Sequence, residues 1–332
     1  MKQTKWKKYI IYIAFSLFII VFIPTIVVNF SKENGVHKES NITEETENTE
    51  EGEPSFFVQV EREATGEIET VPIEEYVISV VAAEMPADFN LEALKAQAVA
   101  ARTYVVQQMI QQGEDTVMTD TTAHQVYKNR EELKEHFGGS YEEKMKKIEQ
   151  AAIATAGEVI TYNNEPITPT FFSMSNGYTE AAKNYWGNDL PYLQVVESKW
   201  EESLPNFTEQ KVFTLEEMNN ALQLNHNGGE VPIYVKRTES NRVETLKIGE
   251  VAFSGKEIRE KLQLRSNDFS VKQKGDHFIF TTKGFGHGVG MSQYGANFMA
   301  EEGKNYQDIL AYYYKDVHIE ALQDTAPSLV SN

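Results

Sequence analysis

A glutamate at the end of an apolar stretch is the first candidate for acid–base chemistry. Glu84 stands in Ala82-Ala83-Glu84-Met85-Pro86, directly after residues whose apolar spacing predicts a helix. A carboxyl there faces the negative end of the helix dipole, and its apolar neighbours would partly remove it from water. Both effects raise the pKa of a carboxyl, as a general acid working near neutral pH requires. A solvated glutamate that simply ends the helix fits these residues at least as well.

Two cations follow on the next predicted helix. Lys95 and Arg102 are seven residues apart, which places them on one helix face, about 20° from alignment. They form either a solvated stripe or a clamp for an anionic or hydroxyl-rich substrate. An ion pair from either cation would lower the pKa of Glu84, so we assign both to substrate rather than to contact with the carboxyl.

Small polar residues after a predicted strand could bind a polar ligand. The segment 172–178 contains Ser173, Ser175, Asn176 and Tyr178 around a glycine. Hydroxyls and an amide in a turn can hydrogen-bond such a ligand. Ser173 is a weak candidate for a nucleophile, because the G-x-S-x-G pattern of a nucleophile elbow is absent.

A glycine-rich segment contains a further group of candidates. Five glycines between 284 and 296 surround His287, and Gln293 and Tyr294 stand near the end of the segment. So many glycines indicate unusual backbone angles or a close approach of backbone. The segment lacks the Gly-Lys-Ser/Thr of a phosphate-binding loop and the βαβ context of a dinucleotide fingerprint. A purely structural loop is the alternative.

His124 is the remaining isolated candidate. With Asp120, four residues earlier, it could ligate a metal, but neither H-E-x-x-H nor another complete ligand set occurs, and the chain has no cysteine. A lone histidine with a hydrogen-bond partner is more often structural. We therefore predict no metal and no cofactor.

The residues that position these groups alternate between strand and helix patterns. Strands are expected at 57–61 and up to 71, and helices at about 73–84, 91–112, 141–156 and 306–314. Hairpins are expected between 158–162 and 167–172, between 233–236 and 243–248, and between 269–272 and 277–281. Capping boxes begin at Thr214 and Ser254. Without a βαβ rhythm, this predicts an α+β fold of mixed helices and antiparallel hairpins, forming two subdomains around a substrate cleft.

Composition limits the classes of partner. The 332 residues are 41% hydrophobic, which suffices for a buried core. With 31 Lys and Arg against 50 Asp and Glu, the formal charge is −19. Proteins that coat nucleic acids normally carry a basic surface, so we expect no nucleic-acid partner.

The N-terminus predicts a membrane anchor. Residues 10–28 form an apolar run that would span about 28 Å as a helix, close to the hydrocarbon thickness of a bilayer. Lysines precede this run and an acidic stretch follows it, so the positive-inside rule places residues 1–9 in the cytoplasm and the remainder outside. A cleavable signal peptide is the alternative, but the run is longer than a typical signal core and no clear small-x-small site follows it.

The expected domain organisation follows from these segments. After the transmembrane anchor at 10–28, residues 29–55 are predicted to be an acidic disordered linker. Residues 56–320 form the extracytoplasmic domain, with a possible smaller subdomain at about 200–280. Residues 321–332 are expected to be a loose tail.

Taken together, five segments closely resemble the stage II sporulation protein D family. They are Glu-Glu-Tyr-Val at 74–77, Ala-Glu-Met-Pro at 83–86, Leu-Lys-Ala-Gln-Ala-Val-Ala-Ala-Arg-Thr-Tyr at 94–104, Ser-Asn-Gly at 175–177 and His-Gly-Val-Gly-Met-Ser-Gln-Tyr-Gly-Ala at 287–296. The resemblance covers roughly 56–319. The motifs are specific in combination, although each alone is not, and the anchor and linker agree with the family layout.

The resemblance implies a membrane-anchored peptidoglycan lytic transglycosylase of endospore-forming bacteria. Such an enzyme cleaves the β-1,4 bond between N-acetylmuramic acid and N-acetylglucosamine in peptide-stripped glycan, leaving a 1,6-anhydromuramic end. Ordinary glycosidases need two carboxylates. Here the muramic 6-hydroxyl attacks within its own molecule, so one residue can serve as acid and then as base.

By matched position, the resemblance makes Glu84 the catalytic acid. The residues expected to hold the sugars are Lys95, Arg102, Tyr104, His124, Ser173, Ser175, Asn176, Tyr178, His287, Gln293 and Tyr294. Some relatives hold a zinc near the Asp-Thr-Thr segment through cysteines, which this chain lacks. We therefore expect no structural zinc there.

The resemblance also implies partners and a location. The partners are glycan strands, a sporulation amidase that this protein stimulates, and a further membrane protein of the engulfment complex. The location is the mother-cell membrane at the sporulation septum.

Two other functional classes are alternatives to a lytic transglycosylase. A non-catalytic wall-binding module that only recruits the amidase is disfavoured by the presence of Glu84 and Arg102. A serine esterase or metal-dependent deacetylase is disfavoured by the missing nucleophile elbow and the incomplete ligand sets.

Overall fold

A computed structural model of the chain describes residues 56–113 and 115–330. The predicted anchor at 10–28 and the acidic linker at 29–55 lie outside these residues. Within the described residues, no helix is both long and apolar enough to cross a bilayer.

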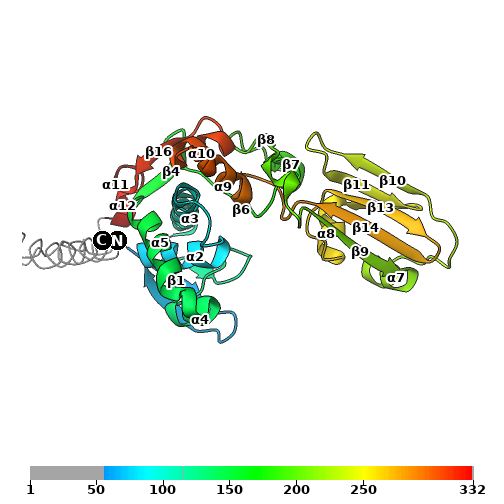
Figure 1. Cartoon of the computed structure of the whole chain (residues 1–332), viewed down its shortest axis with the longest axis horizontal. Coiled ribbons are helices and arrows are strands. Elements are labelled where there is room, and N and C mark those ends of the chain that lie inside the picture. The colour runs from blue at the N-terminus through cyan, green and yellow to red at the C-terminus, as the bar shows by residue number, and fades with distance from the viewer. Residues whose placement is uncertain (1–55, 114, 331–332) are drawn as a thin grey trace, which may run out of the picture. The chain divides into compact units, whose positions relative to one another are not determined.

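The described part of the chain alternates between helices and short strands (Figure 1). Its helices are α2 (Ile73–Glu84), α3 (Leu91–Gln112), α4 (Arg130–Phe137), α5 (Tyr141–Ile153), α6 (Ala182–Trp186), α7 (Leu215–Leu222), α8 (Gly255–Lys261), α9 (Gln293–Glu301), α10 (Tyr306–Tyr313), α11 (Leu322–Thr325) and α12 (Pro327–Val330), with short 3-10 turns η1 (Gly138–Ser140) and η2 (Trp200–Ser203). Its strands are β1 (Phe57–Glu61), β2 (Ile68–Pro72), β3 (Val117–Thr119), β4 (Glu158–Tyr162), β5 (Glu165–Pro166), β6 (Phe171–Phe172), β7 (Gly177–Tyr178), β8 (Glu197–Ser198), β9 (Thr208–Thr214), β10 (Ile233–Arg237), β11 (Val243–Ile248), β12 (Val251–Ser254), β13 (Phe269–Lys274), β14 (His277–Lys283), β15 (Met291–Ser292) and β16 (His318–Ala321).

The first hydrophobic core is built around α3. The Asn90 side chain accepts a hydrogen bond from the Glu92 amide (3.0 Å) and caps the helix, and Gly113, with a φ of 105°, ends it. Because α3 is rich in alanine, neighbouring elements can approach it closely, and it packs against α2, α5, α9, α10 and β4 (Figure 1). The small sheets β2-β1-β3 and β16-β4-β5 complete this part of the fold.

A second hydrophobic core lies within residues 208–283, close to the range in which a smaller subdomain was expected. It is formed by two three-stranded antiparallel sheets, β10-β11-β12 and β13-β14-β9, with α7 and α8 (Figure 1). Thr214 and Ser254 begin these two helices with complete capping boxes, as predicted.

Most of the predicted elements are confirmed. The helices at 73–84 and 91–112 have the predicted bounds, and the hairpins β10–β11 and β13–β14 pair antiparallel. The turn Asn163-Asn164 joins β4 to β5, with φ values of 53° and 65°. The expectation of mixed helices and antiparallel hairpins is therefore confirmed.

Three local predictions differ from the structure. The partner of β4 in the expected hairpin is β5, which lies before the expected strand 167–172. Only Phe171–Phe172 of that range form a strand, β6, which pairs in parallel with β15; Pro169 lacks the N–H that a longer ladder would need. Helix α4 was not predicted, although Asn129 and Glu132 form a capping box at its start. The tail from 321 was expected to be loose, but it contains α11 and α12, which bury Leu322 and Leu329 in the first core.

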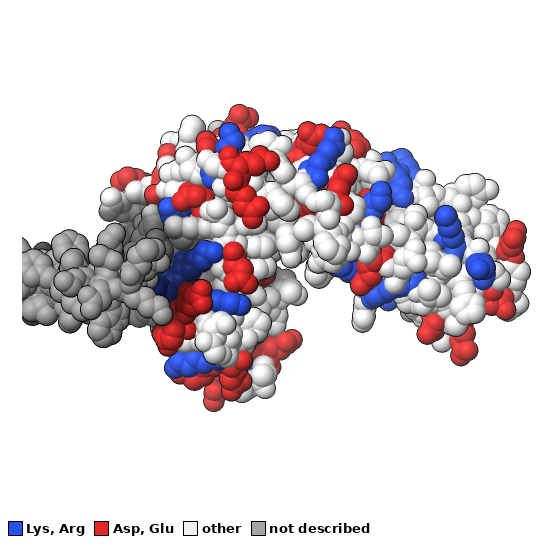
Figure 2. All heavy atoms as spheres, in the orientation of Figure 1, with Lys and Arg blue, Asp and Glu red and all other residues white. Residues whose placement is uncertain are grey.

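Charged side chains are distributed over both parts of the described chain. On the face drawn in Figure 2, acidic and basic residues are intermixed, without a large area of one sign. The negative charge of the chain is thus not concentrated there in one acidic surface.

Candidate active site

Glu84 is the last residue of α2. Met85 leaves the helical region, with φ −123° and ψ 138°, as expected for a residue that precedes proline. The Glu84 side chain is half-buried, and its Oε1 accepts a hydrogen bond from the Val126 amide (2.7 Å). Burial raises the pKa of the Glu84 carboxyl above its usual value, while the hydrogen bond from Val126 opposes the rise. The predicted direction of the pKa shift is therefore found.

The Glu84 hollow is an open depression of about 460 Å³ that Glu84 helps to line. One side is formed by residues 82–88, which include Asp88. The other side comes from His136 and Phe137 at the end of α4 and from Lys144 on α5. Sequence reasoning missed this second side, because it comes from chain about fifty residues away and α4 was not predicted.

Helix α9 positions the chain that follows Glu84. The Gln293 Nε2 donates to the backbone carbonyl of Glu84 (3.0 Å), and the Tyr294 ring packs edge-on against Phe89, with centroids 4.9 Å apart. The Asn297 side chain accepts from the Asn90 amide (2.7 Å). The predicted residues Gln293 and Tyr294 are thus brought to the 84–90 segment, where they hold its backbone and packing.

His124 lies in the loop that supplies the Val126 amide. Its Nδ1 accepts from the Thr119 amide (3.0 Å), and burial lowers its pKa, so the imidazole is neutral near pH 7. Asp120 is paired with Arg62, with 3.1 Å between the Arg62 Nε and the carboxylate. In the part of the chain that the structure describes, no three His, Cys, Asp or Glu residues are grouped as metal ligands would be.

Arg102 does not have the predicted role, and Lys95 has protein partners. The Arg102 side chain has no exposed surface, and its Nε and Nη2 donate to the Glu74 carboxylate at 2.9 and 2.5 Å. Lys95 donates to Glu92 (2.7 Å) and lies over the Tyr306 ring, so it joins α3 to α10. The assignment of Arg102 to substrate is wrong, because a guanidinium enclosed by protein cannot reach a ligand, and Lys95 is likewise occupied in packing.

Tyr104, also assigned to substrate, is half-buried. Its ring packs against the first core, and burial raises the pKa of its phenol. Its contacts among the described residues are those of a core side chain.

The Ser-Asn-Gly segment connects the two cores. Asn176 donates through Nδ2 to the Ser240 carbonyl and to Asp268, both at 2.9 Å, and it is almost fully buried. The Ser175 hydroxyl is buried and donates to the Tyr178 carbonyl (3.1 Å). Prediction of Ser175 and Asn176 as substrate-binding residues is therefore wrong, because protein partners use their polar atoms.

Tyr178 and Ser173 flank this junction. The Tyr178 carbonyl also accepts from Arg242 (2.8 Å), and its half-buried ring lies under the Lys199 ammonium. The Ser173 carbonyl accepts from the Tyr294 amide (3.1 Å) and so connects this segment to α9. Both residues fix neighbouring backbone through their carbonyls, and neither lines the Glu84 hollow.

His287 lies in an aromatic cluster rather than beside Glu84. Its ring centroid is 5.5 Å from that of Trp186, 5.7 Å from Tyr185 and 5.9 Å from Phe172. Burial, with Arg259 and Arg242 nearby, lowers its pKa to about 3, so it is neutral at physiological pH. The adjacent Gly288 has a φ of 87°, and a Cβ there would overlap the Arg242 guanidinium, which explains one glycine of the motif.

Glu201 is a buried carboxyl that the sequence did not single out. Its Oε1 accepts from the Ser292 hydroxyl (2.6 Å), and Ser292 is the N-cap of α9. Burial raises the pKa of Glu201, whereas the Ser292 hydrogen bond lowers it. Glu201 thereby anchors the end of α9 that carries Gln293. The surrounding sequence Ser198-Lys199-Trp200-Glu201-Glu202-Ser203 matches no catalytic or ligand-binding motif, so no pattern pointed to it.

Gly295 illustrates how tightly α9 is packed, and it supports a first prediction. A Cβ at this position would overlap the Tyr313 hydroxyl and lie 2.7 Å from the Ser198 Oγ. Gly295→Ala is therefore expected to destabilise the fold by about 1–3 kcal/mol, measured as a lower Tm. Adding Tyr313→Phe, which removes the hydroxyl, should recover part of the loss; no loss in the single variant would contradict this packing.

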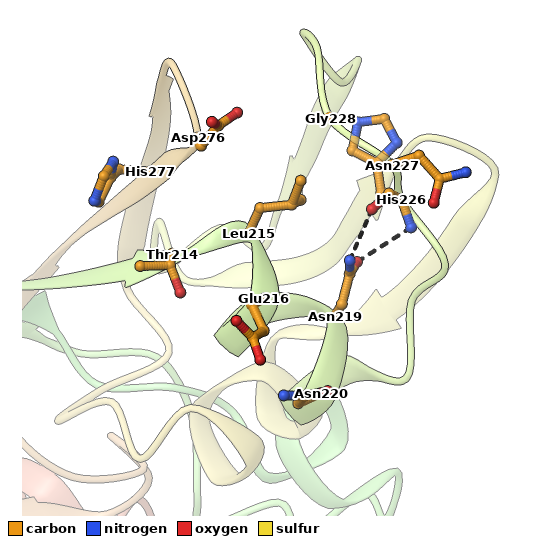
Figure 3. A pocket seen from close by; sticks show the side chains of 10 residues that line it. All are labelled: Thr214, Leu215, Glu216, Asn219, Asn220, His226, Asn227, Gly228, Asp276 and His277. Carbon is orange, nitrogen blue, oxygen red and sulfur yellow. Dashed lines mark hydrogen bonds between the residues drawn. The ribbon is translucent and has the colours of Figure 1, made fainter.

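A second hollow of about 580 Å³ lies on the second core (Figure 3). Asn219 is one of its lining residues, and its side chain donates to the His226 carbonyl (2.8 Å) and accepts from the His226 amide (3.2 Å). None of the predicted site residues lines it.

The fold and the site define a class: an α+β protein with a carboxyl of raised pKa among the residues that line an open hollow. The family model described as "Stage II sporulation protein" matches residues 61–162. Stage II sporulation protein D of Bacillus subtilis is 43% identical over 328 residues, covering 94% of this chain and 96% of that protein. That of Bacillus amyloliquefaciens is 43% identical, covering 91% and 92%.

A more distant relative is the amidase enhancer of Bacillus subtilis. It is 29% identical over 304 residues, covering 71% of this chain and 39% of that longer protein. The chain belongs to the stage II sporulation protein D family.

Proposed function

We propose that this protein is a peptidoglycan lytic transglycosylase acting on peptide-stripped glycan during spore engulfment. Glu84 donates its proton to the glycosidic oxygen between N-acetylmuramic acid and N-acetylglucosamine, and the bond to the muramic C1 breaks. The muramic 6-hydroxyl attacks C1, and its proton passes to the Glu84 carboxylate. The observation that carries this proposal is a half-buried Glu84 carboxyl, with a raised pKa, at the wall of an open hollow.

The Glu84 hollow contains a second carboxyl, Asp88, which bears on the reaction class. A hydrolase would use a second carboxylate to activate water or to attack the sugar. The Asp88 side chain is 84% exposed and lies 3.8 Å from the Lys144 ammonium, so it is a solvated, ion-paired group. We expect Asp88→Asn to retain formation of the anhydro product. Loss of all cleavage in this variant would favour a two-carboxylate hydrolase.

The products decide between the two reactions. Purified protein is incubated with peptide-free glycan strands, and the released fragments are weighed by mass spectrometry. An intramolecular transglycosylase gives muramic ends lighter by one water than the hydrolytic product. Fragments that carry only hydrolysed ends would overturn the proposed chemistry.

The raised pKa predicts the pH dependence of cleavage. A general acid must be protonated, and the protonated fraction of Glu84 falls as the pH rises through its raised pKa. The alkaline limb of kcat/KM is therefore expected above the ordinary glutamate value of about 4.3. A limb at or below that value would show that Glu84 is not the acid.

A second role, stimulation of an amidase, is suggested by the relative named amidase enhancer. We propose a sporulation amidase and a further membrane protein of the engulfment complex as partners. Release of stem peptides by the amidase, with and without this protein, tests the stimulation. If a Glu84→Gln variant stimulates as well as the natural chain while cleaving no glycan, the two roles are separate. If the natural chain stimulates but never cleaves, it is a non-catalytic scaffold.

We also propose the location that the sequence predicts. The apolar run at 10–28 would anchor the chain in the mother-cell membrane at the septum, with residues 1–9 cytoplasmic and the folded domain outside. Protease added to intact protoplasts should digest the folded domain and spare an N-terminal tag.

A further inference from the structure

On the side of the Glu84 hollow opposite residues 82–88, Lys144 forms an ion pair with Asp88 that a ligand carboxylate could replace. The Lys144 ammonium lies over the Phe137 ring, 5.3 Å from its centroid, and 3.8 Å from the Asp88 carboxylate. The Lys144 side chain is 30% exposed, whereas that of Asp88 is 84% exposed. An ion pair this long and this open to water is weak, so another carboxylate can replace Asp88 at little cost.

Of the described residues that line the hollow, Lys144 is the one lysine or arginine. The pKa of His136 is lowered by burial and by Lys128 and Lys144, so this imidazole is neutral near pH 7. Lys147 donates to the Asp88 backbone carbonyl (3.2 Å). Glu84, when it carries the proton for catalysis, adds no negative charge.

Peptide-stripped glycan presents an anion at a fixed place. N-acetylmuramic acid carries a lactyl ether, whose carboxyl is joined to the stem peptide by an amide bond. Cleavage of that amide leaves a free lactyl carboxylate, which is ionised at neutral pH. Each muramic residue of a stripped strand therefore has one negative charge beside the sugar ring that a peptide-bearing strand lacks.

We propose that Lys144 binds this lactyl carboxylate and makes the Glu84 hollow selective for peptide-free strands. Asp88 holds the ammonium in place until the substrate carboxylate replaces it. The inference rests on the proposed function, because it assigns a specificity to the same hollow.

Two substrates and four variants test the proposal. The substrates are peptide-free strands with free lactyl carboxylates, and the same strands with those groups converted to uncharged amides. The variants are Lys144→Gln, Lys144→Arg, Asp88→Asn and, as matched control, Lys146→Gln. Lys146 is an exposed cation on the same helix that lines a different depression, beside Arg130 and Tyr141. Binding of each strand to the full-length protein in detergent is measured together with KM and kcat.

The expected pattern is specific to charge recognition. Lys144→Gln should raise Kd and KM about tenfold for carboxylate strands, leave kcat nearly unchanged and leave the amidated strands unaffected. Lys144→Arg should restore most of the affinity, and Asp88→Asn should tighten binding of carboxylate strands by removing the competing group. Lys146→Gln should behave as the natural chain.

Two results would overturn the proposal. One is equal affinity of the natural chain for both strands; the other is an equal loss on both strands in Lys144→Gln. Failure of the proposed function has a different signature, since the natural chain would then release no product from either strand. The Kd comparison decides the role of Lys144 in that case too, because binding needs no turnover.

Discussion

Glu84→Gln is expected to slow release of 1,6-anhydromuramic fragments, and with it glycan cleavage, by about 100- to 10,000-fold. The amide has nearly the same shape as the carboxyl, and its oxygen can still accept the hydrogen bond from the Val126 amide, which the structure places at 2.7 Å. It cannot protonate a glycosidic oxygen or take up the proton of the 6-hydroxyl. Mass spectrometry of digests of peptide-free strands measures the loss.

The same variant should not weaken the fold. Because burial raises the pKa of Glu84, the native state binds this proton more tightly than the unfolded chain does. The stabilisation from this group is present at low pH and is lost as the pH rises through the raised pKa. Glutamine has no ionised form, so Glu84→Gln should have an equal or higher Tm near pH 7.

A matched control excludes a general effect of losing an acidic residue. Glu131 on α4 has a side chain that is 79% exposed and a long ion pair with Lys134. Glu131→Gln should cleave as fast as the natural chain. Retention of anhydro product by Glu84→Gln would remove Glu84 from the proposed role, and a lowered Tm in this variant would make its loss of activity uninformative until a stable variant is tested.

Arg102→Met is expected to cause the largest loss of stability, on the order of 3 kcal/mol. The guanidinium is fully buried, donates twice to Glu74 and also donates to the Glu158 carbonyl (3.2 Å). Removing it takes two donors from Glu74, which keeps the hydrogen bond from the Gly157 amide (3.1 Å), and one donor from the Glu158 carbonyl. Since the Glu74 side chain is 36% exposed, water can reach it, so the loss should fall at the low end for a buried pair.

The measurement is chemical denaturation, with Arg102→Lys and Glu74→Gln for comparison. Lysine keeps the charge but lacks the planar fork that contacts both Glu74 oxygens, so it should recover only part of the stability. Glu74→Gln should cost less than Arg102→Met, because it leaves the guanidinium with one polar side chain and its backbone partners. If Arg102→Met unfolds at the same denaturant concentration as the natural chain but loses glycan affinity, Arg102 binds substrate after all.

Local patterns accounted for the secondary structure because the interactions that start and stop these elements are close in sequence. Asn90 and Gly113 bound α3 by contacts within one turn, and Thr214 begins α7 through its own capping box. Pro86 ends α2, which puts Glu84 at a helix terminus whatever the remaining chain does. The hairpins followed for the same reason, since their turn residues lie between the strands they join.

The roles of the candidate site residues were predicted less well than the secondary structure. The motifs identified the family correctly, but a motif does not say whether its polar atoms face solvent or protein. Asn176 and Arg102 are polar residues whose partners, Asp268 and Glu74, lie 92 and 28 residues away. Because those partners meet only when the chain is folded, no spacing rule could assign these side chains to structure.

The amino-acid sequence by itself determined helices α2 and α3, the hairpins β10–β11 and β13–β14, the place of Glu84 at the end of α2, and the membership of the family. Only the tertiary structure decided that Arg102 is enclosed while Lys144 is open, and that α4 and α5 form the far wall of the Glu84 hollow. The physical reason is that burial, and with it the pKa of a carboxyl and the reach of a cation, depends on which distant segments pack together.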